Sequence, residues 1–249
     1  FKIAHHLAFI VNWAQGDRGA IGTGLFAEIS ERRFLITAKH VLKGATDDQI
    51  YINLGLQDQH HVFRKLDRWE NAHLDLAFIE LDRTETDFIR DGIDPFSINA
   101  KQRRGDKPKY NGLAICGYPK TYWIKSNPSY VTAGSFTIAL QHPLPTDQWP
   151  QRAKDEYDPE DFFLVSLREE DLGQQLVDQD GKLPSGLDPH GMSGSPVWLF
   201  DINTVNNENP DYGFCGILTG YLTYEPNILK CTFINKIIEE FERRYGFNI

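Results

Sequence analysis

Three short segments of the chain carry residue types that together can perform nucleophilic catalysis. His40 follows the apolar run 34–37, Asp75 precedes the apolar run Leu76–Leu81, and Ser193 lies within the sequence HGMSGSPV. A serine hydroxyl becomes a useful nucleophile when a neighbouring imidazole takes its proton. The imidazole in turn needs a carboxylate that fixes its tautomer and stabilises the imidazolium. The three residues therefore predict a catalytic triad.

The residues around Ser193 predict a site that stabilises a developing oxyanion. The reaction creates a negative oxygen that two backbone N–H groups can bind. Gly191 lies two residues before Ser193 and lacks a Cβ, so the backbone can turn there without interference. We expect the N–H groups of Gly191 and Ser193 to be the two donors.

The chain order separates this site from the other serine hydrolase folds. The order His40, Asp75, Ser193 is the chymotrypsin order. An α/β-hydrolase elbow has the form Gly-x-Ser-x-Gly, but Ser195 stands at the fifth position here. That fold also needs a histidine after the serine, and the last histidine of this chain is His190. The elbow is therefore excluded.

Short apolar runs rich in Val, Ile, Phe and Tyr recur between turn residues and must position these side chains. Few of them are long enough for helices, and their spacing favours an all-β sandwich or barrel over alternating βα units. The predicted strands are 7–11, 24–29, 34–37, 49–54, 76–81, 112–117, 135–140, 162–167, 196–200, 213–219 and 229–234.

A stretch rich in proline and charge, from about 95 to 111, separates two groups of strands. We therefore expect an N-terminal β unit over 1–100, a linker over 101–112, a C-terminal β unit over 113–234 and a helix over 235–249.

The final segment shows the one clear helical period. Asn235 is the expected cap at its start, and Gly246 is the expected end. The residues predicted to face the core share the spacing i, i+3, i+4, i+7, i+11: Ile234, Ile237, Ile238, Phe241 and Tyr245.

The three chemical segments resemble the recurring blocks of the trypsin/chymotrypsin-like serine protease superfamily. Thr37-Ala-Lys-His40 is similar to Thr-Ala-Ala-His, and the segment that begins at Asp75 is similar to Asp-Ile-Ala-Leu. The Gly-x-Ser-Gly-Ser-Pro form around Ser193 is similar to bacterial trypsin-like peptidases such as glutamyl endopeptidases. The resemblance implies two perpendicular six-stranded β-barrels, the first giving His40 and Asp75 and the second Ser193. It also implies a serine endopeptidase that works through an acyl-enzyme, without metal or organic cofactor.

The resemblance also implies the substrate-binding residues. Thr219 stands at the position whose hydroxyl supports the triad aspartate, and Thr219, Gly220 and Tyr221 would pair with an extended substrate as an added strand. Leu187 and Asp188 lie near the expected floor of the specificity pocket.

Four residues depart from the family blocks. Lys39 replaces an alanine before the histidine, and Ser195 replaces a glycine after the serine. Met192 stands where trypsin-type zymogens carry an aspartate that receives the new N-terminus, so activation by such an ion pair is not expected. Leu218 stands where glutamyl endopeptidases carry a histidine that reads the substrate carboxylate, which argues against glutamate specificity.

Composition and short motifs argue against a nucleic-acid partner, a membrane span and a metal site. The formal charge of −9 argues against a nucleic-acid partner, and the one basic run, 101–109, fits an exposed linker. The apolar run 7–11 is far shorter than a membrane span. The pairs His5-His6 and His60-His61 lack further ligands at metal-binding spacing, so no metal site is expected.

Cysteine usage favours a reducing compartment. Cys116, Cys215 and Cys231 form an odd set in apolar, strand-like surroundings, which predicts buried free thiols. We therefore expect a cytoplasmic protein. The chain begins at Phe1, so removal of a signal peptide, and with it a secreted or periplasmic protein, stays open.

Two alternatives to an active protease, which would act on a protein or peptide substrate, remain at this stage. The first is a protease-like binding or scaffold domain in which the triad survives and the cleft is closed. The second is a latent effector protease that needs an activating partner or an additional domain. Both keep the catalytic residues, because residue identity alone does not establish aligned geometry.

Overall fold

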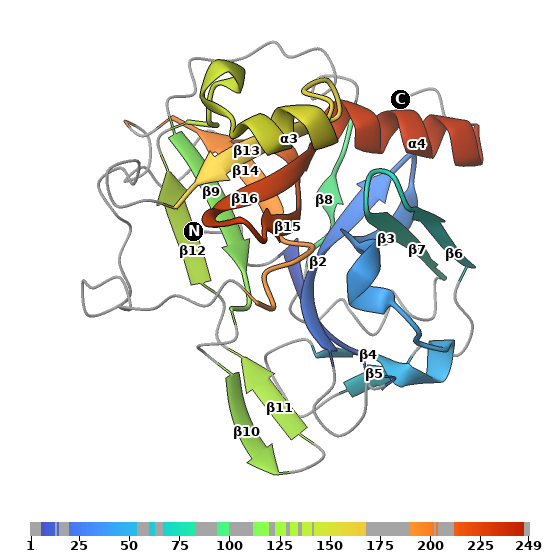
Figure 1. Cartoon of the computed structure of the whole chain (residues 1–249). Coiled ribbons are helices and arrows are strands. Elements are labelled where there is room, and N and C mark those ends of the chain that lie inside the picture. Colours follow the sequence, from blue (N-terminus) through green and yellow to red (C-terminus); the bar gives the residue numbers. More distant parts are fainter. Residues whose placement is uncertain are drawn as a thin grey trace. The chain divides into compact units, whose positions relative to one another are not determined.

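The computed structural model describes residues 6–12, 14, 20–53, 60–62, 67–82, 94–99, 112–119, 123–127, 130–133, 136–140, 142–167, 190–201, 203 and 212–246. These residues are mostly β, with two large sheets, few helices and a C-terminal helix (Figure 1). The predicted all-β class with a C-terminal helix is thereby confirmed, but the first sheet has eight strands where six were expected.

The chain divides into two compact units. The first comprises Phe1–Ile98, Cys116–Phe136 and Pro184–Ser195, and the second comprises Asn99–Ile115, Thr137–Leu183 and Pro196–Ile249. His40, Asp75 and Ser193 therefore all belong to the first unit, although the sequence had assigned Ser193 to the second barrel. The domain boundaries drawn from the sequence stay a prediction.

The first unit contains an eight-stranded sheet in the order β5-β4-β1-β2-β3-β7-β6, with β8 paired to β2. Only the pairing of β8 with β2 is parallel among these. The strands are β1 (Leu7–Asn12), β2 (Ala20–Ile29), β3 (Arg32–Ala38), β4 (Ile50–Asn53), β5 (His60–Val62), β6 (Asp67–Asn71), β7 (Leu76–Leu81) and β8 (Phe96–Ser97). The two-stranded ribbon of β10 (Trp123–Asn127) and β11 (Tyr130–Ala133) also belongs to this unit.

Apolar side chains from the strands of this sheet pack into one buried core. Ile10 of β1, Leu35 of β3, Ile52 of β4 and Ile79 of β7 are fully or almost fully buried in one cluster. Each such side chain stabilises the fold by about 1.5–3 kcal/mol relative to an exposed one. The ends of β3 and β7, which carry the catalytic candidates, are thus fixed by packing.

The sheet of the second unit has six strands in the order β12-β9-β14-β15-β16-β13. They are β9 (Gly112–Gly117), β12 (Phe136–Leu140), β13 (Phe162–Ser166), β14 (Pro196–Phe200), β15 (Tyr212–Leu222) and β16 (Glu225–Phe233). Ala153 of the short helix α3 (Gln151–Glu156) and Trp149, which precedes this helix, pack with Leu164, Leu222 and Ile228.

The C-terminal helix α4 (Ile234–Tyr245) buries Ile234, Ile237, Ile238 and Phe241, as the spacing predicts. It ends at Gly246, whose φ of +67° is the left-handed conformation that glycine adopts readily. The prediction of Asn235 as the cap was wrong. The helix begins directly where β16 ends, so Phe233 is the capping position and makes no side-chain cap. Among the described residues, no helix is long and apolar enough to cross a membrane.

Three turns of 3₁₀ helix complete the described elements: η3 (Lys39–Leu42), η4 (Asp47–Gln49) and η6 (Thr146–Gln148). Of these, η3 bears on function because it contains His40.

All three cysteines are free and buried, as expected. Burial, and after it the neighbouring Cys215 thiol, raise the pKa of Cys231 well above the usual range. Only the thiolate reacts with common thiol reagents, so this residue is chemically protected.

We therefore expect the native protein to resist thiol reagents. Titration with Ellman's reagent should find almost no reactive thiol in the folded protein and all three in guanidinium chloride. Rapid modification of Cys231 without unfolding would contradict its burial.

Candidate active site

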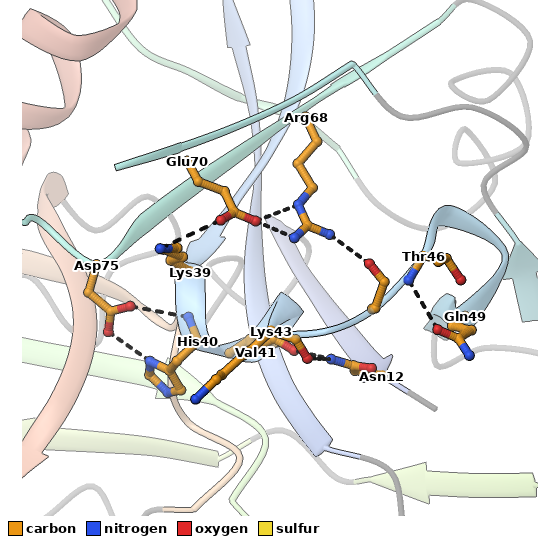
Figure 2. Close-up of polar contacts among 11 residues, drawn as sticks. Asn12, Lys39, His40, Val41, Lys43, Thr46, Gln49, Arg68, Glu70 and Asp75 are labelled. Atoms are coloured by element: carbon orange, nitrogen blue, oxygen red, sulfur yellow. Dashed lines mark hydrogen bonds and ion pairs between the residues drawn. The ribbon is translucent and has the colours of Figure 1, made fainter. Parts of the chain in front are cut away.

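His40 and Asp75 form a directly hydrogen-bonded pair (Figure 2). His40 lies in η3 directly after β3, and Asp75 lies directly before β7. Asp75 Oδ2 is 2.7 Å from Nδ1 of His40, and Oδ1 accepts the His40 backbone N–H at 3.1 Å. Since the carboxylate holds Nδ1, the Nε2 atom is the nitrogen left for proton transfer. Among the described residues it has no hydrogen-bond partner.

The backbone at Asp75 is in an uncommon conformation. Its φ is +54°, in the left-handed region that Asp and Asn enter more readily than most residues. The side chain of Asn71 accepts the N–H groups of His73 and Leu74 at 2.9 and 3.0 Å, and the Asp75 carbonyl accepts the Lys39 N–H at 2.9 Å. This turn directs the carboxylate toward His40.

The backbone that follows His40 is held at three carbonyl groups (Figure 2). The fully buried Asn12 donates through Nδ2 to the carbonyls of Val41 and Lys43, at 2.9 and 3.1 Å. Arg68 Nη1 donates to the Ala45 carbonyl at 3.1 Å. Because buried carbonyls without partners are costly, these contacts fix the turn that carries the imidazole.

The charge of Lys39 is paired with a carboxylate other than Asp75. Its ammonium lies 3.7 Å from Glu70, which also forms an ion pair with Arg68 (Figure 2). Lys39 thus adds a cation that Glu70 balances, and the His40–Asp75 pair stays intact.

Ser193 lies in a tight turn within the first unit. The Ser195 N–H donates to the Met192 carbonyl at 2.8 Å, which closes a β-turn around Ser193 and Gly194. Gly194 has a φ of +88° at the third position of this turn, where a type II turn requires a positive value. A Cβ on Gly194 would also overlap the carbonyl of Thr23, so only glycine fits.

The two predicted oxyanion donors, the N–H groups of Gly191 and Ser193, lie on either side of Met192. Gly191 has a φ of +91°, a conformation open mainly to glycine. Within the described part of the chain, neither the Gly191 nor the Ser193 N–H donates to an acceptor. The Ser193 hydroxyl and the His40 imidazole, both described by the structure, are not hydrogen-bonded to each other.

The other departures lie in the interior. Met192 and Ser195 are fully buried, and Leu218 of β15 is 2% exposed. The Ser195 hydroxyl has no hydrogen-bond partner among the described residues. Met192 therefore serves as an apolar anchor of the turn, and a buried methionine offers no ion pair to an amino terminus.

Of the residues expected to bind substrate, the structure describes only those on β15. Thr219 is buried, Gly220 is half-buried, and Tyr221 is exposed. The Thr219 hydroxyl donates to the Lys230 carbonyl at 3.3 Å and lies 3.4 Å from the Thr232 hydroxyl. Leu187 and Asp188 lie outside the described residues.

No protein-family profile matches the sequence, and no curated protein matches it. Solved structures of serine proteases do match. The chain has a trypsin-like protease fold.

Three of these structures give the range of the match. An inactivated protease paralogue from the scabies mite is 12% identical, with a TM-score of 0.58 and coverage of 97% of this chain and 94% of that one. A protease from M. tuberculosis in its active form is 15% identical, with a TM-score of 0.50 and coverage of 95% and 79%. A serine endoprotease from Yersinia pestis is 16% identical, with a TM-score of 0.53 and coverage of 97% and 64%. These identities establish the fold alone, and the finer resemblance to glutamyl endopeptidases stays a prediction.

Sequence reasoning missed the residues that hold the site together. Asn12, Asn71 and Thr23 each bind backbone groups that are distant in sequence or hidden in a turn. Of the three, Asn71 carries the clearest local signal, because Asn two residues before a turn N–H commonly caps it.

Proposed function

We propose that the protein is a serine endopeptidase that hydrolyses peptide bonds through an acyl-enzyme. The observation that carries this proposal is the 2.7 Å contact between His40 Nδ1 and Asp75 Oδ2, with Gly191 and Ser193 in the same unit. The trypsin-like protease fold supports it.

In the proposed reaction, Ser193 Oγ attacks the scissile carbonyl carbon while His40 Nε2 takes the hydroxyl proton. The Gly191 and Ser193 N–H groups bind the resulting oxyanion. His40 then gives its proton to the leaving amine, and the acyl group remains on Ser193. Water, deprotonated by His40 Nε2, attacks the ester carbonyl. The bond to Ser193 Oγ then breaks, His40 returns the proton to Oγ, and the acid is released. Asp75 stabilises the imidazolium in both steps.

The second unit offers a backbone edge for an extended substrate. β14 pairs with β15 only as far as Ile217, and the residues beyond it pair only with β16. In the described residues no strand pairs with Leu218–Leu222 on the side away from β16. A peptide can add to such an edge through main-chain hydrogen bonds. This supports Thr219, Gly220 and Tyr221 as substrate-binding residues, with Leu187 and Asp188 as proposed pocket residues.

A second candidate is a protease-like scaffold or a latent effector protease. It is favoured by the missing hydrogen bond between Ser193 and His40, and by the inactivated paralogue among the similar structures. In a latent protease, an activating partner or further domain would bring the hydroxyl into line with Nε2.

A fluorophosphonate probe separates these candidates, because it reacts only with an activated serine. We expect one label per wild-type chain, none on Ser193→Ala, and full labelling of Ser195→Ala, whose hydroxyl is buried. Equal labelling of wild type and Ser193→Ala would remove Ser193 as the nucleophile. An unlabelled wild type would favour the scaffold or the latent protease.

A further inference from the structure

Thr23 of β2 makes contacts that no catalytic role yet explains. Its side chain is fully buried. Its backbone N–H donates to the Ser193 carbonyl at 2.8 Å, and its hydroxyl donates to the Gly191 carbonyl at 2.9 Å. One residue therefore holds the turn on both sides of Met192.

The hydroxyl of Thr23 also serves as an acceptor. The Tyr118 N–H donates to Thr23 Oγ1 at 3.0 Å. One proton and one lone pair of the hydroxyl are thereby committed, and both partners are backbone groups in a buried environment. Removing the hydroxyl would leave the Gly191 carbonyl and the Tyr118 N–H unpaired together.

These contacts determine where the Ser193 N–H group points. In a trans peptide the N–H points opposite to the carbonyl of the preceding residue. Three consecutive carbonyls have fixed donors: Thr23 Oγ1 for Gly191, Ser195 N–H for Met192, and Thr23 N–H for Ser193. The Ser193 N–H belongs to the middle peptide, which lies between the two that Thr23 holds. Its direction is thus fixed from both sides.

The close fit of this turn on β2 leaves little room for other arrangements. A Cβ on Gly194 would overlap the Thr23 carbonyl, and a Cβ on Gly117 would overlap the Ser195 hydroxyl. The Thr23 carbonyl itself accepts the Thr37 hydroxyl at 2.7 Å. The turn is therefore seated on a rigid strand that is tied to β3.

We propose that Thr23 is a positioning residue that keeps the Ser193 N–H group directed at the oxyanion. The inference rests on the proposed function, because it concerns the stabilisation of the tetrahedral intermediate of that reaction. Thr23 acts through the backbone of the turn, and among the described residues it makes no hydrogen bond to His40 or Asp75.

The test compares Thr23→Val, which keeps the shape and loses the hydroxyl, with Thr23→Ser, which keeps the hydroxyl. Ser166→Ala removes a buried hydroxyl from β13 in the second unit and serves as the control for general destabilisation. Fluorescent casein reports activity, and a fluorogenic peptide taken from a casein cleavage site gives kcat and KM. A peptide boronate of the same sequence, which forms a tetrahedral adduct, reports oxyanion binding.

For Thr23→Val we expect kcat to fall by roughly 10- to 100-fold, somewhat less than the loss of an entire oxyanion donor. The boronate affinity should fall in parallel, while KM and the pH dependence of kcat stay as in wild type. Thr23→Ser should stay within about threefold of wild type. Hydrogen exchange at Tyr118 and Ser195 should be faster in Thr23→Val than in Thr23→Ser, because the first loses its acceptor and the second lies in the turn.

The outcomes separate the two levels of the proposal. If wild type cleaves casein but Thr23→Val matches Thr23→Ser in kcat, boronate affinity and exchange, the positioning role is wrong and the proposed function stands. If Thr23→Val and Ser166→Ala lose activity only in proportion to their unfolded fraction, the role is merely structural and the inference fails. If wild type neither cleaves casein nor reacts with a fluorophosphonate, the proposed function fails and takes the catalytic role of Thr23 with it.

Discussion

Replacement of Ser193 by alanine should lower kcat by roughly five to six orders of magnitude, the loss seen when the nucleophile of a comparable triad is removed. The substitution deletes one oxygen from a half-buried side chain and leaves the turn unchanged, since the Ser193 hydroxyl makes none of the hydrogen bonds that hold the turn. The free energy of unfolding should therefore change by less than about 0.5 kcal/mol.

The matched control is Ser195→Ala, two residues away. The Ser195 hydroxyl is buried and has no partner among the described residues, while its N–H, which closes the turn, is kept in alanine. Steady-state kinetics with one peptide substrate should show near-wild-type kcat for Ser195→Ala. Comparable losses of kcat in both variants would mean that the turn tolerates neither change, and the result would no longer identify Ser193 as the nucleophile.

The strands that position the site could be predicted because burial dominates them. Each predicted strand has a counterpart, since runs such as Leu76–Leu81 are almost entirely buried in the sheet. β6 could not be predicted in this way because its sequence, DRWEN, has no apolar alternation. It is an edge strand held by pairing to β7 and by Trp69, which stacks on Phe78 with ring centroids 5.0 Å apart. The helix α3 could not be predicted because six residues with one buried side chain show no helical period.

In the candidate site, the catalytic residues could be predicted and the residues that hold them in place could not. His40 and Asp75 were predictable because only certain residue types in a certain order can perform the reaction, and the structure pairs them directly. The support is not predictable in this way. Thr23 binds the carbonyl of Gly191, which is 168 residues away, and no local sequence pattern in β2 indicates that contact. Such roles depend on strand register, which is set by the packing of the whole sheet.

The last expectation concerns the carboxylate, and it is the sharpest test of the His40–Asp75 pair. Asp75→Asn should lower kcat by about 10⁴-fold at neutral pH, as the same change does in a well-studied triad. An amide can turn its NH₂ group toward Nδ1 and so favour the tautomer that carries the proton on Nε2, which cannot act as the base. It also removes the charge that stabilises the imidazolium.

The fold should survive this substitution. The backbone of residue 75 has a φ of +54°, which asparagine adopts as readily as aspartate, and the Lys39 N–H still binds the unchanged carbonyl. The control is Glu70→Gln, which also removes one negative charge, but from a carboxylate that contacts Lys39 and Arg68. We expect kcat of Glu70→Gln within about threefold of wild type, because partly exposed ion pairs contribute little. Near-normal turnover of Asp75→Asn, with thermal unfolding unchanged, would assign the role to another carboxylate such as Asp82 and would leave the 2.7 Å contact without a catalytic meaning.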